Sequence, residues 1–356
     1  MRNLPSDLLA NIFSFLSPDS LARATAVCKE WHMTAKCAAL RRRHPAWLLA
    51  LPSRSRSLSC YLHNPAQQTW HSLSLSFVPA PSKAIATING LLIFKSTATI
   101  ALQLSICNPF TRQFKYLPVL CIARTNPAVG VIEVGTTHFM IYVAGGMSDA
   151  SKAGGATYES TVEMYDSRYD TWEVIGTMPV EFAVRLTVWS PNESVYSKGV
   201  LYWMTSARTY SIMGFEVETN KWRELSVPMG DTLEFASLII RNGNLTLVGG
   251  GGDVWIWELR VEDDWRLVEK MGLELKMKFL GGKGSWGCTK CVGIEGGMCL
   301  YREFGVDMLV WRKVVGECSS NWEWCWIKGC SSIKEQQVPR VSIKGLLIHP
   351  NLSCPV

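Results

Sequence analysis

The sequence has little of what marks a membrane or nucleic-acid-binding protein. It contains no apolar run near the ~18 residues that a membrane span requires, and its first seven residues do not form the apolar stretch of a signal peptide. A net charge of +6 over 356 residues is mild, so neither a membrane nor a nucleic acid is the expected partner. The run 41–43, three arginines, is too short to act as an import signal. We therefore expect an intracellular protein of the nucleus, the cytoplasm or both.

Catalytic and metal-binding patterns are also scarce. The six histidines are scattered, and no set of nucleophile, histidine and acid can be assembled from the sequence. Cys288 and Cys291 have the spacing of a zinc-ligand pair, but no second Cys-x-x-Cys and no histidine lies nearby. The run 282–287 matches a dinucleotide fingerprint by letter, yet no helical pattern follows it, which indicates a plain loop. We expect no metal, no cofactor and, in a reducing compartment, free thiols.

The first 45 residues show a helical pattern. Leu8, Leu9, Ile12, Phe13 and Leu16 recur at spacings of three and four, which predicts a helix with one apolar stripe. The Ser-Pro-Asp run that follows supplies an N-cap, a proline suited to the first turn and an acid near the positive helix end, so a second helical segment should begin there. Because domains below ~40 residues seldom bury their apolar surface alone, we expect a partner protein to cover this unit.

These residues resemble an F-box. The resemblance rests on the Leu-Pro start, on the apolar positions of the helix and on the Cys-Lys-x-Trp run that ends at Trp31. It implies docking on a Skp-type adaptor, while Val27 and Trp31 brace the helices. The adaptor-binding residues that it implies are Leu4, Pro5, Leu8, Leu9, Ile12, Phe13, Leu16 and Leu21. The alternative is a helical hairpin that only caps the domain after it.

From about residue 46 onward the sequence changes to short β-rich runs separated by glycine, proline and asparagine, with no convincing long amphipathic helix. A unit repeats in which an apolar strand and a turn lead to an aromatic residue that opens the next strand. The six aromatic residues are Trp70, Phe114, Trp172, Trp222, Trp265 and Trp322. Turns such as Asn89-Gly90, Lys198-Gly199 and Asn242-Gly243 predict hairpins. Glycine pairs at 145–146 and 249–250 let the backbone bend beside a crowded interior.

This unit resembles the kelch repeat, whose period is ~50 residues. The resemblance implies a mainly β fold, in which a six-bladed kelch-type β-propeller (residues 46–350) follows a small all-α F-box module (residues 1–45). The C-terminal strand near 341–349 should complete the first blade and close the ring. The first two units lack the glycine pair, which leaves the blade number open by one. That departure resembles the plant F-box/kelch proteins.

Together the two resemblances imply the non-catalytic substrate-recognition subunit of an SCF-type (Skp-cullin-F-box) E3 ubiquitin ligase. The F-box would bind the Skp adaptor and, through it, the cullin scaffold and the RING subunit. The propeller would hold a target protein for ubiquitination. Two alternatives stay open: a kelch binding protein that acts on the adaptor without a cullin, and a propeller enzyme.

We expect the target to bind one face of the propeller. The loops that should form this face are 95–99, 146–159, 179–185, 205–210 and 281–287. They carry basic and aromatic residues, which are enriched in binding hot spots. The predicted target-binding residues are Arg185, Arg208, Tyr210, Lys283 and Trp286.

Overall fold

The computed structural model describes most of the chain. The described residues are 4–16, 18–41, 45–52, 59–135, 137–148, 155–189, 194–281, 284–303, 307–315, 320–329, 342–352, 354 and 356. Three helices come first, α1 (Ser6–Ser14), α2 (Pro18–Thr25) and α3 (Lys29–Arg41), and β-strands dominate the remainder. The class is therefore mainly β with a small helical module at the N-terminus, as the sequence predicted.

The strands form six four-stranded antiparallel sheets. From the innermost strand outward, the first blade contains β26 (Ile343–Ile348), β1 (Trp47–Pro52), β2 (Ser59–Asn64) and β3 (Thr69–Ser74), the second β4 (Ser82–Ile88), β5 (Leu91–Ser96), β6 (Leu104–Asn108) and β7 (Gln113–Tyr116), and the third β8 (Ala128–Glu133), β9 (Phe139–Ala144), β12 (Thr161–Asp166) and β13 (Thr171–Thr177). The fourth contains β14 (Ser194–Ser197), β15 (Val200–Ser206), β16 (Tyr210–Glu216) and β17 (Lys221–Ser226), the fifth β18 (Phe235–Arg241), β19 (Asn244–Gly250), β20 (Val254–Leu259) and β21 (Trp265–Lys270), and the sixth β22 (Thr289–Ile294), β23 (Gly297–Arg302), β24 (Met308–Val315) and β25 (Ser320–Ile327). A two-stranded hairpin, β10 (Met147–Ser148) and β11 (Thr157–Tyr158), projects from the third blade.

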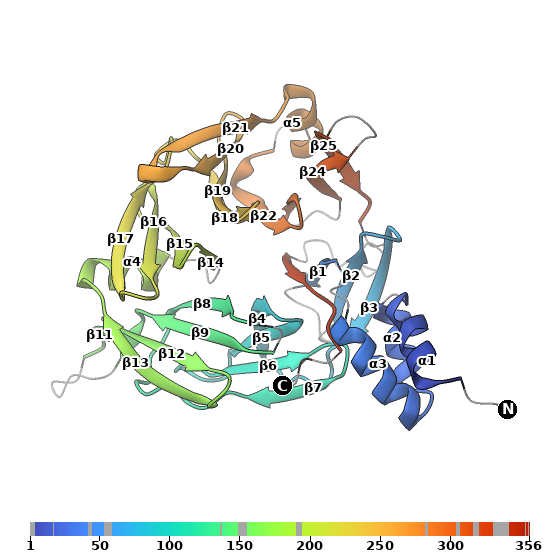
Figure 1. Cartoon of the computed structure of the whole chain (residues 1–356). Helices are drawn as coiled ribbons and strands as arrows, with labels where there is room; N and C mark the ends of the chain where they lie inside the picture. The colour runs from blue at the N-terminus through green and yellow to red at the C-terminus, as the bar shows by residue number, and fades with distance from the viewer. Residues whose placement is uncertain are drawn as a thin grey trace.

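The six sheets are arranged radially around a common centre (Figure 1). Their innermost strands contact one another in the order β4, β8, β14, β18, β22 and β26, and β26 contacts β4 again. Each sheet face is covered by the next blade, so no blade has to bury its apolar face alone. The fold is a six-bladed β-propeller, which confirms the predicted class and blade number.

The two ends of the propeller sequence meet in the first blade. β26 pairs antiparallel with β1 from Trp47, opposite Ile348, to Pro52, opposite Ile343. The C-terminal part thus supplies the innermost strand of this blade, and the N-terminal part supplies the other three. Backbone hydrogen bonds between segments at opposite ends of the propeller sequence therefore close the ring.

Glycine-containing turns fix the strand register. At Asn89-Gly90, Lys198-Gly199 and Asn242-Gly243 both residues have positive φ, from +48° to +85°. Two successive residues with positive φ form the two-residue turn whose twist matches antiparallel strands. Each turn joins an innermost strand to its neighbour, so these predicted hairpins are confirmed.

Tryptophan side chains link neighbouring blades. The indole N–H groups of Trp70, Trp172 and Trp265 each donate to a backbone carbonyl at the outer end of the preceding blade, at 2.9 Å. In the sixth blade, Trp311 and Trp322 stack with their ring centroids 4.2 Å apart. These rings bury large apolar areas while several of their N–H groups keep a partner, so the aromatic residues of the repeat hold the blades together.

Two helices occur where the sequence predicted only strands and loops. α4 (Val180–Trp189) follows the third blade and α5 (Leu273–Leu280) follows the fifth. The β-branched composition of α4 favours a strand, yet Ala183 and Leu186, three residues apart on one helix face, are buried. The backbone N–H of Gly146 also donates to Thr187 Oγ1 at 2.7 Å. Packing on the propeller therefore decides for a helix, and the expectation of a loop over 179–185 was wrong.

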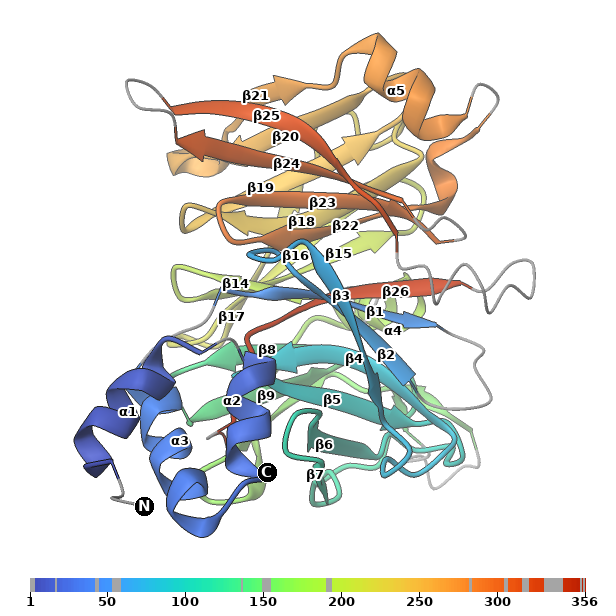
Figure 2. The same cartoon turned by 90° about the vertical axis from the view of Figure 1, so that its right-hand side faces the viewer.

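The helices lie on two different sides of the propeller. Figure 2 shows α1 to α3 at the lower left, and α4 and α5 toward the right. The innermost strands begin on the side of α4 and α5, and we call this side the α4–α5 face. In the described ranges no helix is long and apolar enough to cross a membrane.

Candidate interaction surfaces

The N-terminal module has a small core of its own. Leu9, Phe13 and Leu21 are buried together, with Trp31 packed edge-on against Phe13 at a ring-centroid distance of 5.1 Å. Trp31 thus braces the helices, as predicted. The three buried side chains cannot meet a partner while the module stays folded. They were predicted to bind the adaptor, and their positions instead make them structural, because they lie on the inward side of the helices.

The outward side of the module is apolar. Leu4, Leu8 and Ile12 are 52%, 53% and 49% exposed, and Pro5 between them is exposed as well. Leu16 is half-buried. The predicted set therefore divides between a core and a surface, and the surface part forms one row along α1. Side chains of this size are seldom left in water as a group unless something binds them.

Three more exposed apolar side chains lie on the same module. Phe15, Val27 and Met33 are all more than half exposed. Phe15 and Met33 were not among the predicted contact residues, and Val27 was predicted to brace the helices, which its exposure contradicts. Phe15 and Val27 lie in the turns after α1 and α2, so helical periodicity does not place them.

A C-terminal tail fixes the module to the propeller. Leu352, just after β26, is buried in the core of the module, and Cys354 is buried against the second blade. Asn108, at the end of β6, donates from Nδ2 to the carbonyls of Asn351 at 2.8 Å and Cys354 at 3.2 Å. The same segment of chain therefore touches both parts, and it sets the direction in which the row on α1 points.

The predicted target-binding residues are only partly brought together on the α4–α5 face. Arg185, on α4, forms an ion pair with Glu224 and is about one-third exposed. Arg208 is exposed in the turn between β15 and β16. Tyr210 is half-buried, and its hydroxyl donates to the carbonyl of Glu234 at 3.3 Å. These three side chains lie on neighbouring elements and leave polar groups at the surface.

The other two predicted target-binding residues do not join this set. Lys283 lies outside the described residues. Trp286 is 1% exposed, stacks on Phe279 and packs at a tilt against Phe235, with ring centroids 5.7 Å and 5.8 Å away. The sequence suggested a loop tryptophan at a surface, but the short 3-10 turn at Trp286–Cys288 directs the indole into the core, so it does not agree with a role in target contact.

The cysteine and glycine motifs carry no visible chemistry. In the described ranges no group of three or more His, Cys, Asp or Glu side chains could hold a metal ion. Burial raises the pKa of Cys60 and of Cys107 to about 12, so both stay protonated thiols at neutral pH. In the described part of the glycine motif, residues 284–287, the chain passes through the single 3-10 turn Trp286–Cys288 and then enters strand β22. This part of the motif therefore does not lead into an α-helix N-terminus of the dinucleotide-binding type.

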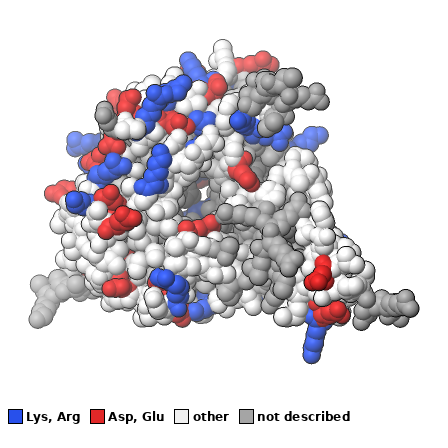
Figure 3. Space-filling view, in the orientation of Figure 1, with Lys and Arg blue, Asp and Glu red and all other residues white. Residues whose placement is uncertain are grey.

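A central cavity of about 880 Å³ runs along the innermost strands. Figure 3 shows the hollow at the centre of the ring from the side opposite the α4–α5 face. All six innermost strands contribute to its lining. No single pattern in the sequence indicated this cavity, because its lining comes from six separate repeats.

Comparison with known protein families and relatives agrees with this architecture. Residues 1–44 match the F-box-like model, and residues 65–249, more than half of the chain, match the model of the F-box associated beta propeller domain. The propeller model that matches is thus the F-box associated one rather than kelch.

Several curated plant proteins are similar along most of the chain. Protein UNUSUAL FLORAL ORGANS of Arabidopsis thaliana is 24% identical over 363 residues, covering 92% of this chain and 78% of that protein. An F-box/kelch-repeat protein of the same plant is 24% identical over 371 residues, covering 94% and 83%. SKP1-interacting partner 15, also of Arabidopsis thaliana, is 31% identical over 154 residues, covering 36% and 41%. With its helical module, its six blades and these matches, the chain belongs to the F-box proteins that carry an F-box associated β-propeller domain.

Proposed function

We propose that this protein is the substrate-recognition subunit of an SCF-type E3 ubiquitin ligase. The observation that carries the proposal is the exposed apolar row Leu4, Leu8 and Ile12 on a module that belongs to the F-box type. A relative whose name says that it interacts with SKP1 supports the same partner. In this proposal the row packs on a Skp-type adaptor, which in turn binds a cullin and a RING subunit.

The adaptor contact can be tested by a pull-down with two charge substitutions. The variant L8E/I12E places two carboxylates in the row on α1. Both side chains are about half exposed in the free chain, so the propeller should fold as before. Burying a leucine or an isoleucine is worth about 1.5–3 kcal/mol each, so adaptor affinity should fall by about a hundredfold or more. A Skp adaptor retained equally by wild type and variant would contradict the proposal.

A matched control is available on the propeller. Val174 and Leu267 are similarly exposed apolar residues, and they lie on the outer strands β13 and β21. The variant V174E/L267E should bind the adaptor as tightly as wild type does. If both double variants lose the adaptor, a general effect on solubility or folding explains the loss, and the row on α1 is not the binding surface.

Target binding is proposed for the α4–α5 face, which lies away from the module (Figure 2). Arg208 and Tyr210 lie on this face with Arg185 beside them. A target held here would share one assembly with the ubiquitin-charged enzyme, so that transfer becomes effectively intramolecular. The chain itself needs no catalytic group for this role, and it would act in the nucleus, the cytoplasm or both.

Cullin recovery separates this proposal from its nearest alternative. Adaptor and cullin recovered together with wild type, and neither with L8E/I12E, is the expected result. Adaptor without cullin would instead identify a propeller protein that acts on the adaptor outside a ligase.

A further inference from the structure

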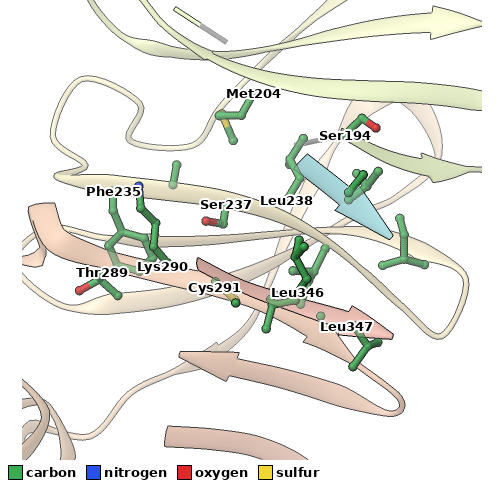
Figure 4. A pocket seen from close by; sticks show the side chains of 18 of the residues that line it. Ser194, Met204, Phe235, Ser237, Leu238, Thr289, Lys290, Cys291, Leu346 and Leu347 are labelled. Carbon is green, nitrogen blue, oxygen red and sulfur yellow. The ribbon is translucent and has the colours of Figure 1, made fainter. Parts of the chain in front are cut away.

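The central cavity has a mainly apolar wall. Its lining includes Val131, Leu238, Ile240, Val292 and Leu347, one or two from each of several innermost strands. Figure 4 shows side chains of Leu238, Leu346 and Leu347 around the same space. A volume of about 880 Å³ falls within the range of ~300–1,000 Å³ that small-molecule pockets occupy, and such pockets combine apolar walls with a few polar groups.

Lysine residues gather at one part of the cavity mouth on the α4–α5 face. Lys83, Lys290 and Lys344 each occupy the second position of an innermost strand, in β4, β22 and β26. These three strands are neighbours in the ring, since β26 contacts both β22 and β4. A fourth lysine, Lys95, lies directly across from Lys83 in the pairing of β4 with β5. We call these four residues the lysine arc.

The lysine arc is compact and reaches the cavity. Lys290 lines the cavity (Figure 4), and Lys344 Nζ donates to the carbonyl of Ile85, another lining residue, at 3.2 Å. Burial, together with the charges of Lys83 and Lys344, lowers the pKa of Lys95. The ammonium groups of Lys83, Lys95 and Lys344 are thus close enough to repel one another, and an anion placed among them would relieve that repulsion.

One lysine of the arc has a carboxylate neighbour. Glu303 forms an ion pair with Lys290 at 3.5 Å, and both side chains remain partly exposed. Within the described part of the chain, Lys83 and Lys95 have no ion pair with an acidic side chain. The equivalent second positions of the other three innermost strands are Val129, Val195 and Ala236, which carry no charge. Positive charge is therefore concentrated on one half of the mouth. Glu234, just before β18, lies on the other half, and its carboxylate accepts hydrogen bonds from Ser285 Oγ and from the backbone N–H of Trp286.

We propose that the central cavity binds an amphipathic organic anion, with its apolar body along the innermost strands and its carboxylate, sulfonate or phosphate group against the lysine arc. The asymmetric mouth gives the ligand one orientation. The head group would then lie on the α4–α5 face, beside the residues proposed to contact a target. The binding itself needs neither the adaptor nor a target, so this inference and the proposed function can fail separately.

Two fluorescent probes test the proposal on the full-length chain. The first, 8-anilinonaphthalene-1-sulfonate, has an apolar body and one negative charge, and the second, N-phenyl-1-naphthylamine, is its uncharged analogue. Wild type should bind one sulfonate probe per chain. Because a hydrogen bond to a charged group contributes about 1.5–3 kcal/mol, K83Q/K290Q should lower the affinity for the sulfonate probe by about tenfold or more. The affinity for the neutral probe should change by less than about twofold, since its binding is apolar.

Control substitutions outside and inside the cavity complete the test. K221Q/K313Q removes two exposed lysines of β17 and β24, which do not line the cavity, and should leave both probes unchanged. L238W fills the cavity and should lower the affinity for both probes. Equal binding of the sulfonate probe by wild type and K83Q/K290Q would overturn the proposal, and so would several sites per chain that L238W leaves intact. If a glutamate decamer binds the chain while neither probe does, the lysine arc is a site for an acidic protein segment, and the proposal of a small amphipathic anion is overturned.

Discussion

Replacing Glu163 by glutamine should destabilise the third blade by about 3–5 kcal/mol. Glu163 lies in the middle of β12, and its carboxylate is fully buried with the guanidinium of Arg124. It accepts hydrogen bonds from the backbone N–H groups of Cys121 at 2.7 Å and Ile122 at 3.0 Å. One carboxylate therefore holds the loop between β7 and β8 and balances a buried positive charge.

The magnitude follows from what glutamine cannot do. Its side chain has the same shape, but its NH₂ group would face an N–H or guanidinium donor. At least one buried donor then loses its acceptor, which costs about 1–3 kcal/mol of stability. The guanidinium of Arg124 also donates to the carbonyls of Gly145 and Thr161, at 3.2 Å and 3.0 Å. These contacts keep it in place without a counter-charge, and an unpaired buried charge accounts for the remainder of the 3–5 kcal/mol.

Hydrogen exchange at the amides of Cys121 and Ile122 measures the effect locally. Three kcal/mol corresponds to exchange that is faster by about a hundredfold. The exposed Glu173, on the adjacent strand β13, offers a matched control. The variant E173Q should change stability by no more than about 0.5 kcal/mol.

A double variant tests the reasoning about charge. R124M/E163Q removes the unpaired guanidinium that E163Q leaves behind, so it should be no less stable than E163Q alone. The reasoning is refuted if E163Q exchanges at the wild-type rate, or if the two single effects simply add.

Three further predictions concern pH, packing and the tail. Burial, helped by the charge of His71, lowers the pKa of His63 from 6.5 to about 4. As the pH falls, the unfolded chain therefore binds the proton before the folded chain does. The free energy of unfolding should be full above pH 6.5 and decline toward pH 4 by up to about 3 kcal/mol. The urea midpoints of H63F should not show this decline. G297A places a Cβ 2.1 Å from the carbonyl oxygen of Trp311 and should lower the free energy of unfolding by about 1–3 kcal/mol or more, whereas G252A, with open space around it, should not. N108A breaks the link to the tail and should raise protease cleavage between module and propeller about tenfold; an unchanged cleavage rate would show that Leu352 holds the module alone.

Local sequence signals predicted the repeat well. Asn-Gly and Lys-Gly turns require positive φ at two successive residues. Few other local backbone structures have this conformation, so these dipeptides indicate hairpins. Large aromatic residues need a buried place wherever the chain folds, so their spacing indicated the blades. The alternating strands of each blade depend mostly on neighbours along the chain, and this is why the fold class and blade number could be predicted.

Local signals were less informative for the helices and the module. The β-branched run of α4 favours a strand in isolation, and only its contact with Gly146 and the fourth blade makes it a helix. Periodicity placed Leu8 and Leu9 in one stripe, since adjacent positions on a helix differ by only 100°. Which of the two points outward depends on the position of α3 and of Leu352, at the far end of the chain.

The sequence by itself determined that a small helical module precedes a β-propeller, and it determined the turns and the aromatic residues that join the blades, because each follows from the chemistry of a short segment. Only the tertiary structure decided that Trp286 is buried, that Arg124 and Glu163 pair, and that three lysines from β4, β22 and β26 meet at one mouth. The physical reason is ring closure. Residues far apart in the sequence become neighbours only after all six blades are packed around the cavity and β26 pairs with β1.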